Sequence, residues 1–297
     1  MYKIDEILKK NSLVATRYEK KNNVYFVDTR DGKFVLKENY HNIDIYNYLK
    51  TRSFNYYPKI LNNQNDKYLI TEYIEDIDIP KEQKILDMIN LVSLLHYKTT
   101  HYKEVTEDDY KQIYEDIDNN INYLYSYYID LITLIETKVY MSPSEYLIAS
   151  NISKLLASLT YAKEELDSWY DDAKEIKKQR LVVLHNNLKL EHFIENENPY
   201  LISWNKSKIG LPIFDLYKLY KKHCLDFDFS EILNRYESKY PLLPHEKKLL
   251  FILIVLPDKI ELNKTEYENT LEVSKVINSL YKTEILVSPK NSKKWKE

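Results

Sequence analysis

The stretch LHNNLKLEH, residues 184–192, gathers two histidines, two asparagines, a lysine and a glutamate within nine positions. An apolar run at 181–184 leads into it, and a second short run follows at 200–202. Both runs have the length and composition of short β-strands, so the residues between them are predicted to form a loop. This loop is the most informative stretch of the chain.

Around that loop the apolar pattern changes from a strand period to a helix period near residue 80. Asp31-Gly32 is typical of a hairpin turn, and Ser142-Pro143-Ser144-Glu145 is a capping box with proline at the first helical position. The expected strands are 14–18, 23–28, 33–37, 57–61, 67–74, 181–184 and 200–202. The expected helices are 2–10, 41–50, 82–96, 107–138 and 142–177, with others beginning near residues 213, 229, 244 and 264. This order predicts an α+β protein.

The composition narrows the class of protein. The chain has 297 residues, 44% of them hydrophobic, and a net charge of −3, so no nucleic-acid partner is expected. The longest apolar run, 249–256, is too short to span a membrane, and residues 1–10 do not resemble a signal peptide. A single cysteine, Cys224, fits a reducing, cytoplasmic interior. With only two glycines, positions that need a positive φ must use other residues.

The order and spacing of several motifs over residues 10–260 resemble the aminoglycoside phosphotransferase and choline kinase superfamily, and within it the kinase-like spore-coat proteins of Firmicutes. The motifs are Phe34-Val35-Leu36-Lys37, Leu69–Ile74, Leu184–His192 and Gly210–Leu216. The resemblance implies a two-lobed, protein-kinase-like fold. Its expected parts are an N-lobe at 1–75, a hinge at 76–80, a helical C-lobe at 81–288 with a degenerate catalytic loop at 184–204, and a disordered basic tail at 289–297.

In such a fold, Lys37 would hold the nucleotide phosphates, with Asp44 on the next helix as its acidic partner. Backbone groups around Glu72, Tyr73 and Ile74 would bind an adenine edge. Each position also has an ordinary structural interpretation, because a lysine at the end of a strand and a glutamate on an edge strand are common surface features.

Within the loop, the resemblance implies a structural role for His185 and places Asn187 at the general-base position. A neutral amide can orient a hydroxyl, but it cannot accept its proton. His192 and Ser203 stand where the family carries its metal-binding asparagine and aspartate. Magnesium prefers oxygen ligands, and a hydroxyl brings no negative charge. Lys189 stands where kinases contact a phosphate, or it is a surface lysine.

The closing motif supplies two further structural positions. The resemblance implies that Gly210 forms a turn and that Asp215 ties down the catalytic loop by accepting backbone hydrogen bonds. Asp215 would also open the following helix, where the helix dipole favours a carboxylate.

Taken together, these replacements predict a catalytically inactive pseudokinase that acts as a binding or structural protein, with a spore-coat or sporulation-linked role. Its partner would be an unknown protein or small-molecule ligand; ATP stays open as a ligand and magnesium is not expected. The alternative is an active ATP-dependent phosphotransferase of a small-molecule hydroxyl. In that case Lys37 and Lys189 would hold phosphates, and Glu191 or Asp215 would bind the metal.

Overall fold

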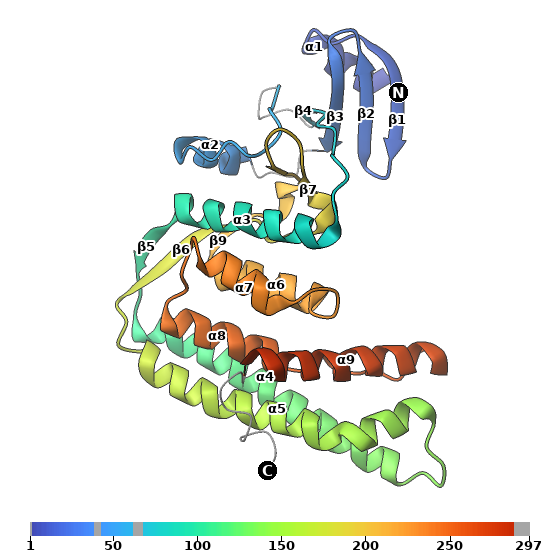
Figure 1. Cartoon of the computed structure of the whole chain (residues 1–297), viewed down its shortest axis with the longest axis vertical. Helices are drawn as coiled ribbons and strands as arrows, with labels where there is room; N and C mark the ends of the chain where they lie inside the picture. Colours follow the sequence, from blue (N-terminus) through green and yellow to red (C-terminus); the bar gives the residue numbers. More distant parts are fainter. Residues whose placement is uncertain (1, 39–42, 62–67, 288–297) are drawn as a thin grey trace. The chain divides into compact units, whose positions relative to one another are not determined.

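The computed structural model describes residues 2–38, 43–61 and 68–287 (Figure 1). Strands dominate the N-terminal part and helices the C-terminal part, so the predicted α+β class is confirmed. The chain divides into two compact units. The first combines residues 1–100 with 182–210, and the second combines residues 101–181 with 211–297. The predicted basic tail at 289–297 lies outside the described residues.

The first unit is built on a four-stranded antiparallel sheet in the order β1-β2-β3-β4. Its strands are Ala15–Lys21, Val24–Thr29, Gly32–Glu38 and Tyr68–Glu72. Helix α1, Tyr2–Lys10, lies against one face and buries Ile4 and Leu8 together with Val27, Leu36 and Ile70 of the sheet. The alternating apolar residues of β2 and β3 supply that buried face.

Tight turns in the sheet follow the predicted chemistry. Thr29 pairs with Gly32 across the β2–β3 turn, and Gly32 has a φ of 135°. The β1–β2 turn uses Asn22, with a φ of 52°, because asparagine tolerates the left-handed region better than most residues. The other described residues with positive φ are Ser12, Ser53, Asn186 and Ser203. Because the chain has few glycines, serine and asparagine occupy these positive-φ positions, as expected.

The strand predicted at 57–61 is reduced to a single bridge between Ile60 and Thr71. Pro58 has no N–H to offer a strand ladder, which accounts for the shortened pairing. Helix α2, Ile43–Thr51, comes before this segment, and α3, Lys81–Thr99, follows β4. Residues 73–80 form neither helix nor strand.

The predicted loop region carries more regular structure than expected. Its elements are β6 (Lys178–Leu184), the 3₁₀ helix η1 (Leu190–His192), β7 (Phe193–Ile194), β8 (Tyr200–Leu201), the 3₁₀ helix η2 (Trp204–Lys206) and β9 (Lys208–Gly210). β7 pairs with β8, and the end of β6 pairs with β9. The start of β6 pairs with β5, His101–Glu104.

Hydrogen bonds join this region to the N-terminal part of the first unit. The Val183 amide donates to the Thr99 hydroxyl at 3.0 Å, and the Leu201 amide donates to the Tyr56 carbonyl at 2.9 Å. The Ile77 amide donates to the Glu195 carbonyl at 2.8 Å. The two compact units therefore group the chain differently from the predicted lobes, and the lobe boundary at 76–80 stays a prediction.

Helices fill most of the second unit. They are α4 (Glu107–Glu136), α5 (Pro143–Ala173), α6 (Ile213–His223), α7 (Phe229–Glu237), α8 (Pro244–Val255) and α9 (Glu266–Val287). A buried ion pair links β6 to α8, since Arg180 Nε donates to Glu246 Oε1 at 3.1 Å and a terminal nitrogen donates to Oε2. The same guanidinium lies over the Tyr240 ring at 4.3 Å from its centroid. No described helix is long and apolar enough to cross a membrane.

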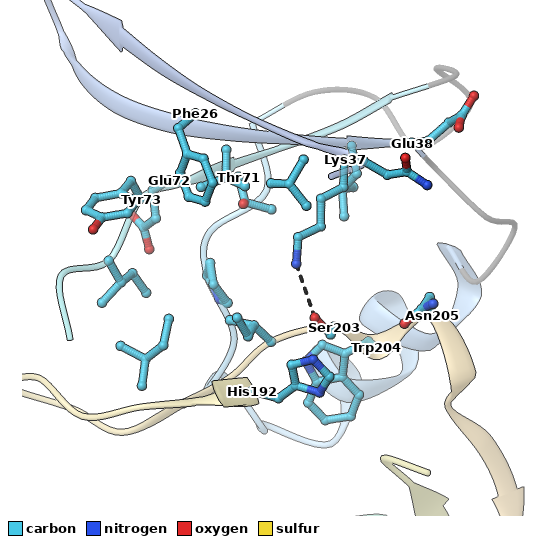
Figure 2. Close-up of a pocket in the computed structure, with 18 of the residues that line it drawn as sticks. Phe26, Lys37, Glu38, Thr71, Glu72, Tyr73, His192, Ser203, Trp204 and Asn205 are labelled. Carbon is cyan, nitrogen blue, oxygen red and sulfur yellow. Dashed lines mark hydrogen bonds between the residues drawn. The ribbon is translucent and has the colours of Figure 1, made fainter. Parts of the chain in front are cut away.

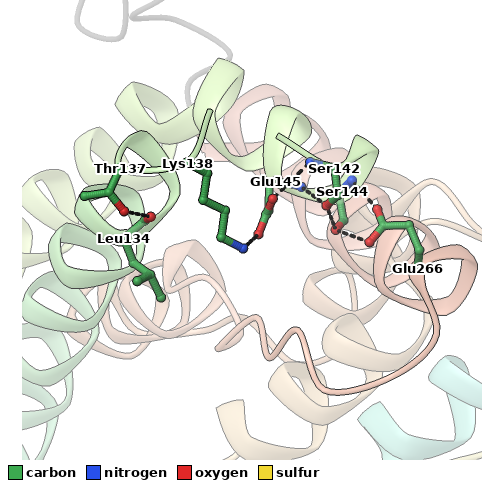
Figure 3. A network of polar contacts seen from close by, with 7 residues as sticks. All are labelled: Leu134, Thr137, Lys138, Ser142, Ser144, Glu145 and Glu266. Atoms are coloured by element: carbon green, nitrogen blue, oxygen red, sulfur yellow. Dashed lines mark hydrogen bonds and ion pairs between the residues drawn. The ribbon is translucent and has the colours of Figure 1, made fainter. Parts of the chain in front are cut away.

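The short connection between α4 and α5 is fixed by polar contacts (Figure 3). The capping box predicted at 142–145 is present: the Ser142 amide donates to Glu145 Oε2 at 2.9 Å, and Glu145 also pairs with Lys138. The Ser144 amide donates to Glu266 Oε1 at 2.7 Å. The start of α5 is therefore attached to the start of α9.

Candidate functional site

A pocket of about 550 Å³ lies in the first unit (Figure 2). Strands β2, β3 and β4 form one side, and residues 191–205 form the other. Seven residues singled out from the sequence line it: Lys37, Glu72, Tyr73, Ile74, Glu191, His192 and Ser203. These residues come from segments far apart in the chain. Their presence in one pocket supports the motif spacing on which the resemblance was based.

Lys37 extends from β3 into the pocket, and its Nζ donates to Ser203 Oγ at 3.2 Å (Figure 2). Burial lowers the pKa of the Lys37 ammonium, because removal from water penalises the charged form. The residue expected to hold phosphates and the residue at the former metal-ligand position are thus in direct contact.

The backbone of Ser203 explains how its side chain reaches Lys37. Ser203 follows β8 and has φ 68° and ψ 49°, in the left-handed region. This conformation turns the chain between β8 and η2. The Ser203 carbonyl accepts a hydrogen bond from Asn187 Nδ2 at 3.4 Å.

Asn187 and His192 both hold the loop together. His192 Nδ1 lies 2.7 Å from the Asn187 carbonyl oxygen, and because a carbonyl only accepts, Nδ1 carries the hydrogen. Burial lowers the pKa of His192, and the nearby charges of Lys189 and Lys37 lower it further, against the opposing effect of the bond to Asn187. The imidazole is therefore neutral near pH 7.

His185 has the contacts of a structural residue. Its side chain is buried, and its Nε2 lies 2.9 Å from the Ile202 carbonyl oxygen. Its ring meets the edge of Trp204 at a centroid distance of 4.8 Å. The neighbouring Asn186 donates to the Lys206 carbonyl at 2.8 Å, so the loop is attached to the segment that carries Ser203.

Part of the backbone at 72–74, which was predicted to bind adenine, already forms hydrogen bonds with neighbouring segments. The Glu72 amide donates to the Lys59 carbonyl and the Tyr73 amide to the Lys33 carbonyl, both at 3.0 Å. These two amides are not available to a ligand, because the bridge at residue 60 and strand β3 flank β4. The Glu72 carboxylate accepts from the Lys59 amide at 2.9 Å. Ile74 follows the end of β4 and lines the pocket.

The remaining predicted positions differ in outcome. Gly210 ends β9 opposite Val182, directly before the turn at 211–212, and its role in that turn stays a prediction. Lys189 is partly exposed and is not among the residues that line the pocket. The Asp44 side chain lies outside the described part of the chain. Asp215 is buried in the first turn of α6, and its role stays a prediction.

The donor groups of the pocket do not fit a magnesium ion. At the two positions where the resemblance predicts metal ligands, His192 offers an imidazole and Ser203 a hydroxyl that already accepts from Lys37. Magnesium sites are built from carboxylate and other oxygen ligands. Over the described ranges, no group of three or more His, Cys, Asp or Glu side chains is arranged to hold a metal. Glu38, Glu72 and Glu191 line the pocket, but they do not form such a group.

Aromatic walls of the pocket were not anticipated from the sequence. Phe26 and Tyr73 meet edge to face at 6.0 Å between ring centroids, and Trp204 lies beside Ser203 (Figure 2). The position of Trp204 next to a predicted site residue was the available signal. Phe26 gave none, because an aromatic residue in a strand is usually part of the core.

An antiparallel sheet that presents a lysine to a strand–loop–strand segment is the arrangement that the predicted kinase-like fold calls for. No protein family model and no curated protein matches this chain. Among solved structures, an aminoglycoside phosphotransferase from Alicyclobacillus acidocaldarius aligns with a TM-score of 0.71 and 7% identity, over 93% of this chain and 91% of that one. A spectinomycin phosphotransferase bound to AMP aligns with a TM-score of 0.56 and 12% identity, over 97% and 98%.

The chain therefore has the fold of the aminoglycoside phosphotransferases, and the predicted resemblance to their superfamily is confirmed at the level of the fold. The narrower resemblance to spore-coat proteins stays a prediction.

Proposed function

We propose that this kinase-fold chain is a pseudokinase, which binds a ligand in its pocket and does not carry out metal-dependent phosphoryl transfer. The contact between Lys37 Nζ and Ser203 Oγ at 3.2 Å carries the proposal. It places a neutral hydroxyl where the resemblance calls for a metal-binding carboxylate.

The general-base position supports the same conclusion. The Asn187 side chain donates to the Ser203 carbonyl, and as an amide it cannot accept a proton from a hydroxyl. Loss of a general base typically costs roughly 10²–10⁴ in rate. Loss of the metal removes a further charge-stabilising contribution of several kcal/mol. The two positions are in contact, since Asn187 bonds to Ser203, and neither supplies the group that the other lacks.

A role in the spore coat or in sporulation is the finer part of the proposal, and it rests on the sequence resemblance alone. The competing function is an active phosphotransferase of small-molecule hydroxyls. The retained pocket and Lys37 favour it, since both would serve a nucleotide. The two functions predict different responses of the protein to ATP with and without magnesium.

The test compares the protein with a variant that restores the three family residues, Asn187→Asp, His192→Asn and Ser203→Asp. Aspartate is enriched in the left-handed region, so it is compatible with the φ of 68° at position 203. ATP hydrolysis and the melting temperature are measured with ATP, with and without magnesium. The unmodified protein is expected to show no magnesium-dependent hydrolysis. The restored variant is expected to gain a magnesium-dependent rise of about 2–4 °C for each kcal/mol of binding.

The control is Ser126→Asp, which adds one carboxylate to the exposed side of α4. It should leave the response to ATP and magnesium unchanged. Magnesium-dependent turnover by the unmodified protein would contradict the proposal and establish the competing function.

A further inference from the structure

Lys37 dominates the charge that the pocket presents to a ligand. Among the described residues that line the pocket, it is the sole lysine or arginine. Its hydrogen bond goes to the neutral Ser203 hydroxyl, and within the described ranges it forms no ion pair. A desolvated ammonium whose hydrogen bond goes to a neutral group favours the binding of an anion.

Carboxylates limit how much negative charge the pocket can accept. Glu38, Glu72 and Glu191 line the same pocket as Lys37. Because the donor set does not fit magnesium, no second cation offsets added anionic charge. A triphosphate, with about four negative charges, would meet one ammonium in a pocket that three glutamates also line. A ligand with one anionic group matches this distribution better.

The walls also indicate the shape of the ligand. Phe26 and Tyr73 present ring edges and faces, and Val35, Leu69 and Ile202 add apolar surface around them. The pocket volume of about 550 Å³ is in the range of sites that hold small organic molecules. Flat rings bind well between such apolar walls.

We infer that the pocket binds, without metal, a flat aromatic molecule that carries a single anionic group held by Lys37, and that it disfavours triphosphates. This inference rests on the proposed pseudokinase function and specifies its ligand. A nucleoside monophosphate and an aromatic carboxylate share the required chemistry, so the experiment separates these two sources.

Binding is measured by calorimetry in EDTA with AMP, adenosine, ATP and 2-naphthoate as probes. Either AMP or 2-naphthoate is expected to bind, and the probe that binds shows whether the ligand is a nucleoside monophosphate or an aromatic carboxylate. AMP binding should exceed adenosine binding by roughly tenfold to a hundredfold if a phosphate is the anion, the range for a hydrogen bond to a charged group. ATP should bind no more tightly than AMP. Tighter binding of ATP, or no binding of either anion, would overturn the inference.

Variants locate the anionic group. Lys37→Met should remove the advantage of the anion over its uncharged analogue. Ser203→Asp, which places a carboxylate next to Lys37 Nζ, should lower the affinity for the anion about tenfold in EDTA. Ser203→Ala should preserve binding. Asp44→Asn should change anion affinity by less than about threefold, because Lys37 and not Asp44 is assigned to the ligand. Unchanged anion affinity in Lys37→Met, with the fold verified by circular dichroism, would refute the assignment.

Lys20→Met is the matched control, since this exposed lysine of β1 is not part of the pocket wall. It should bind as the unmodified protein does. The two proposals fail separately: magnesium-dependent turnover would disprove the pseudokinase, while a preference for ATP without turnover would disprove only the ligand class.

Discussion

His192 shows how a single replacement changes the electrostatics of the loop. Its Nδ1 is held by the Asn187 carbonyl, and burial among positive neighbours disfavours its protonated form. We predict a His192 pKa below the ordinary value of about 6.5, measured by NMR titration of the imidazole. A value above 6.5 would mean that the ring is more solvated, or nearer to a carboxylate, than the structure shows.

The depressed pKa has a consequence for stability whose sign is fixed. The unfolded chain binds the His192 proton more tightly than the folded protein does. Stability contributed by the neutral imidazole is therefore present above about pH 6.5 and is lost as the pH falls through the folded pKa. In urea unfolding, the free energy of unfolding of His192→Gln should fall less between pH 7.5 and pH 5 than that of the unmodified protein. The pKa of His245 is also lowered by burial, so this residue should still cause part of the stability loss in the variant.

Residues of the site could be named from the sequence only where the spacing of the motifs identified them. Lys37 and Ser203 were paired by resemblance, because no local pattern joins residues so far apart in the chain. The hydrogen bonds of the Glu72 and Tyr73 amides could not be foreseen, since they depend on where β4 pairs with residues 59–60 and with β3. The pairing of Gly210 in β9 could not be foreseen, because glycine is permitted in an extended strand as well as in a turn.

At the scale of the element, the start of α5 offers a direct test of helix capping. We predict that Ser142→Ala lowers the free energy of unfolding by about 1 kcal/mol, because it removes the side chain that accepts from the Glu145 amide. Urea unfolding followed by circular dichroism measures the change.

The matched control lies in the same helix. Ser150 is exposed in the middle of α5, and its hydroxyl bonds to the Tyr146 carbonyl. Ser150→Ala should be neutral or slightly stabilising, because alanine is the better helix former. Equal destabilisation by the two substitutions would show that the cap at Ser142 contributes nothing specific.

Elements were predictable where the pattern was long or chemically distinctive. The long helices α4 and α5 and the β2–β3 hairpin all match their expected positions closely. Strands β5, β7 and β9 were missed because two to four residues are too few to show a period. Their formation depends on partners distant in sequence, which a local pattern does not contain.

For the molecule as a whole, the buried pair of Arg180 and Glu246 provides the clearest stability prediction. Both side chains are buried, and Arg180 also donates to the Pro241 carbonyl at 2.9 Å. Arg180→Met should cost about 3–5 kcal/mol in urea unfolding, because Glu246 is left as an uncompensated buried charge.

A double variant separates charge from packing. Arg180→Met combined with Glu246→Leu should recover much of the loss, less the contribution of the hydrogen bond from the Leu243 amide to Glu246. Arg17→Met, at an exposed arginine of β1, is the control and should change stability by less than about 0.5 kcal/mol. Failure of the double variant to recover would indicate that the guanidinium acts mainly through its packing on Tyr240.

The outer strand of the sheet has a consequence for behaviour at high concentration. β1 is an edge strand, exposes Arg17, Glu19, Lys20 and Lys21, and shifts register between Ala15 and Arg17. Charged side chains and irregular pairing at an edge oppose the addition of a strand from another molecule. This border of the sheet is thereby protected against fibril growth.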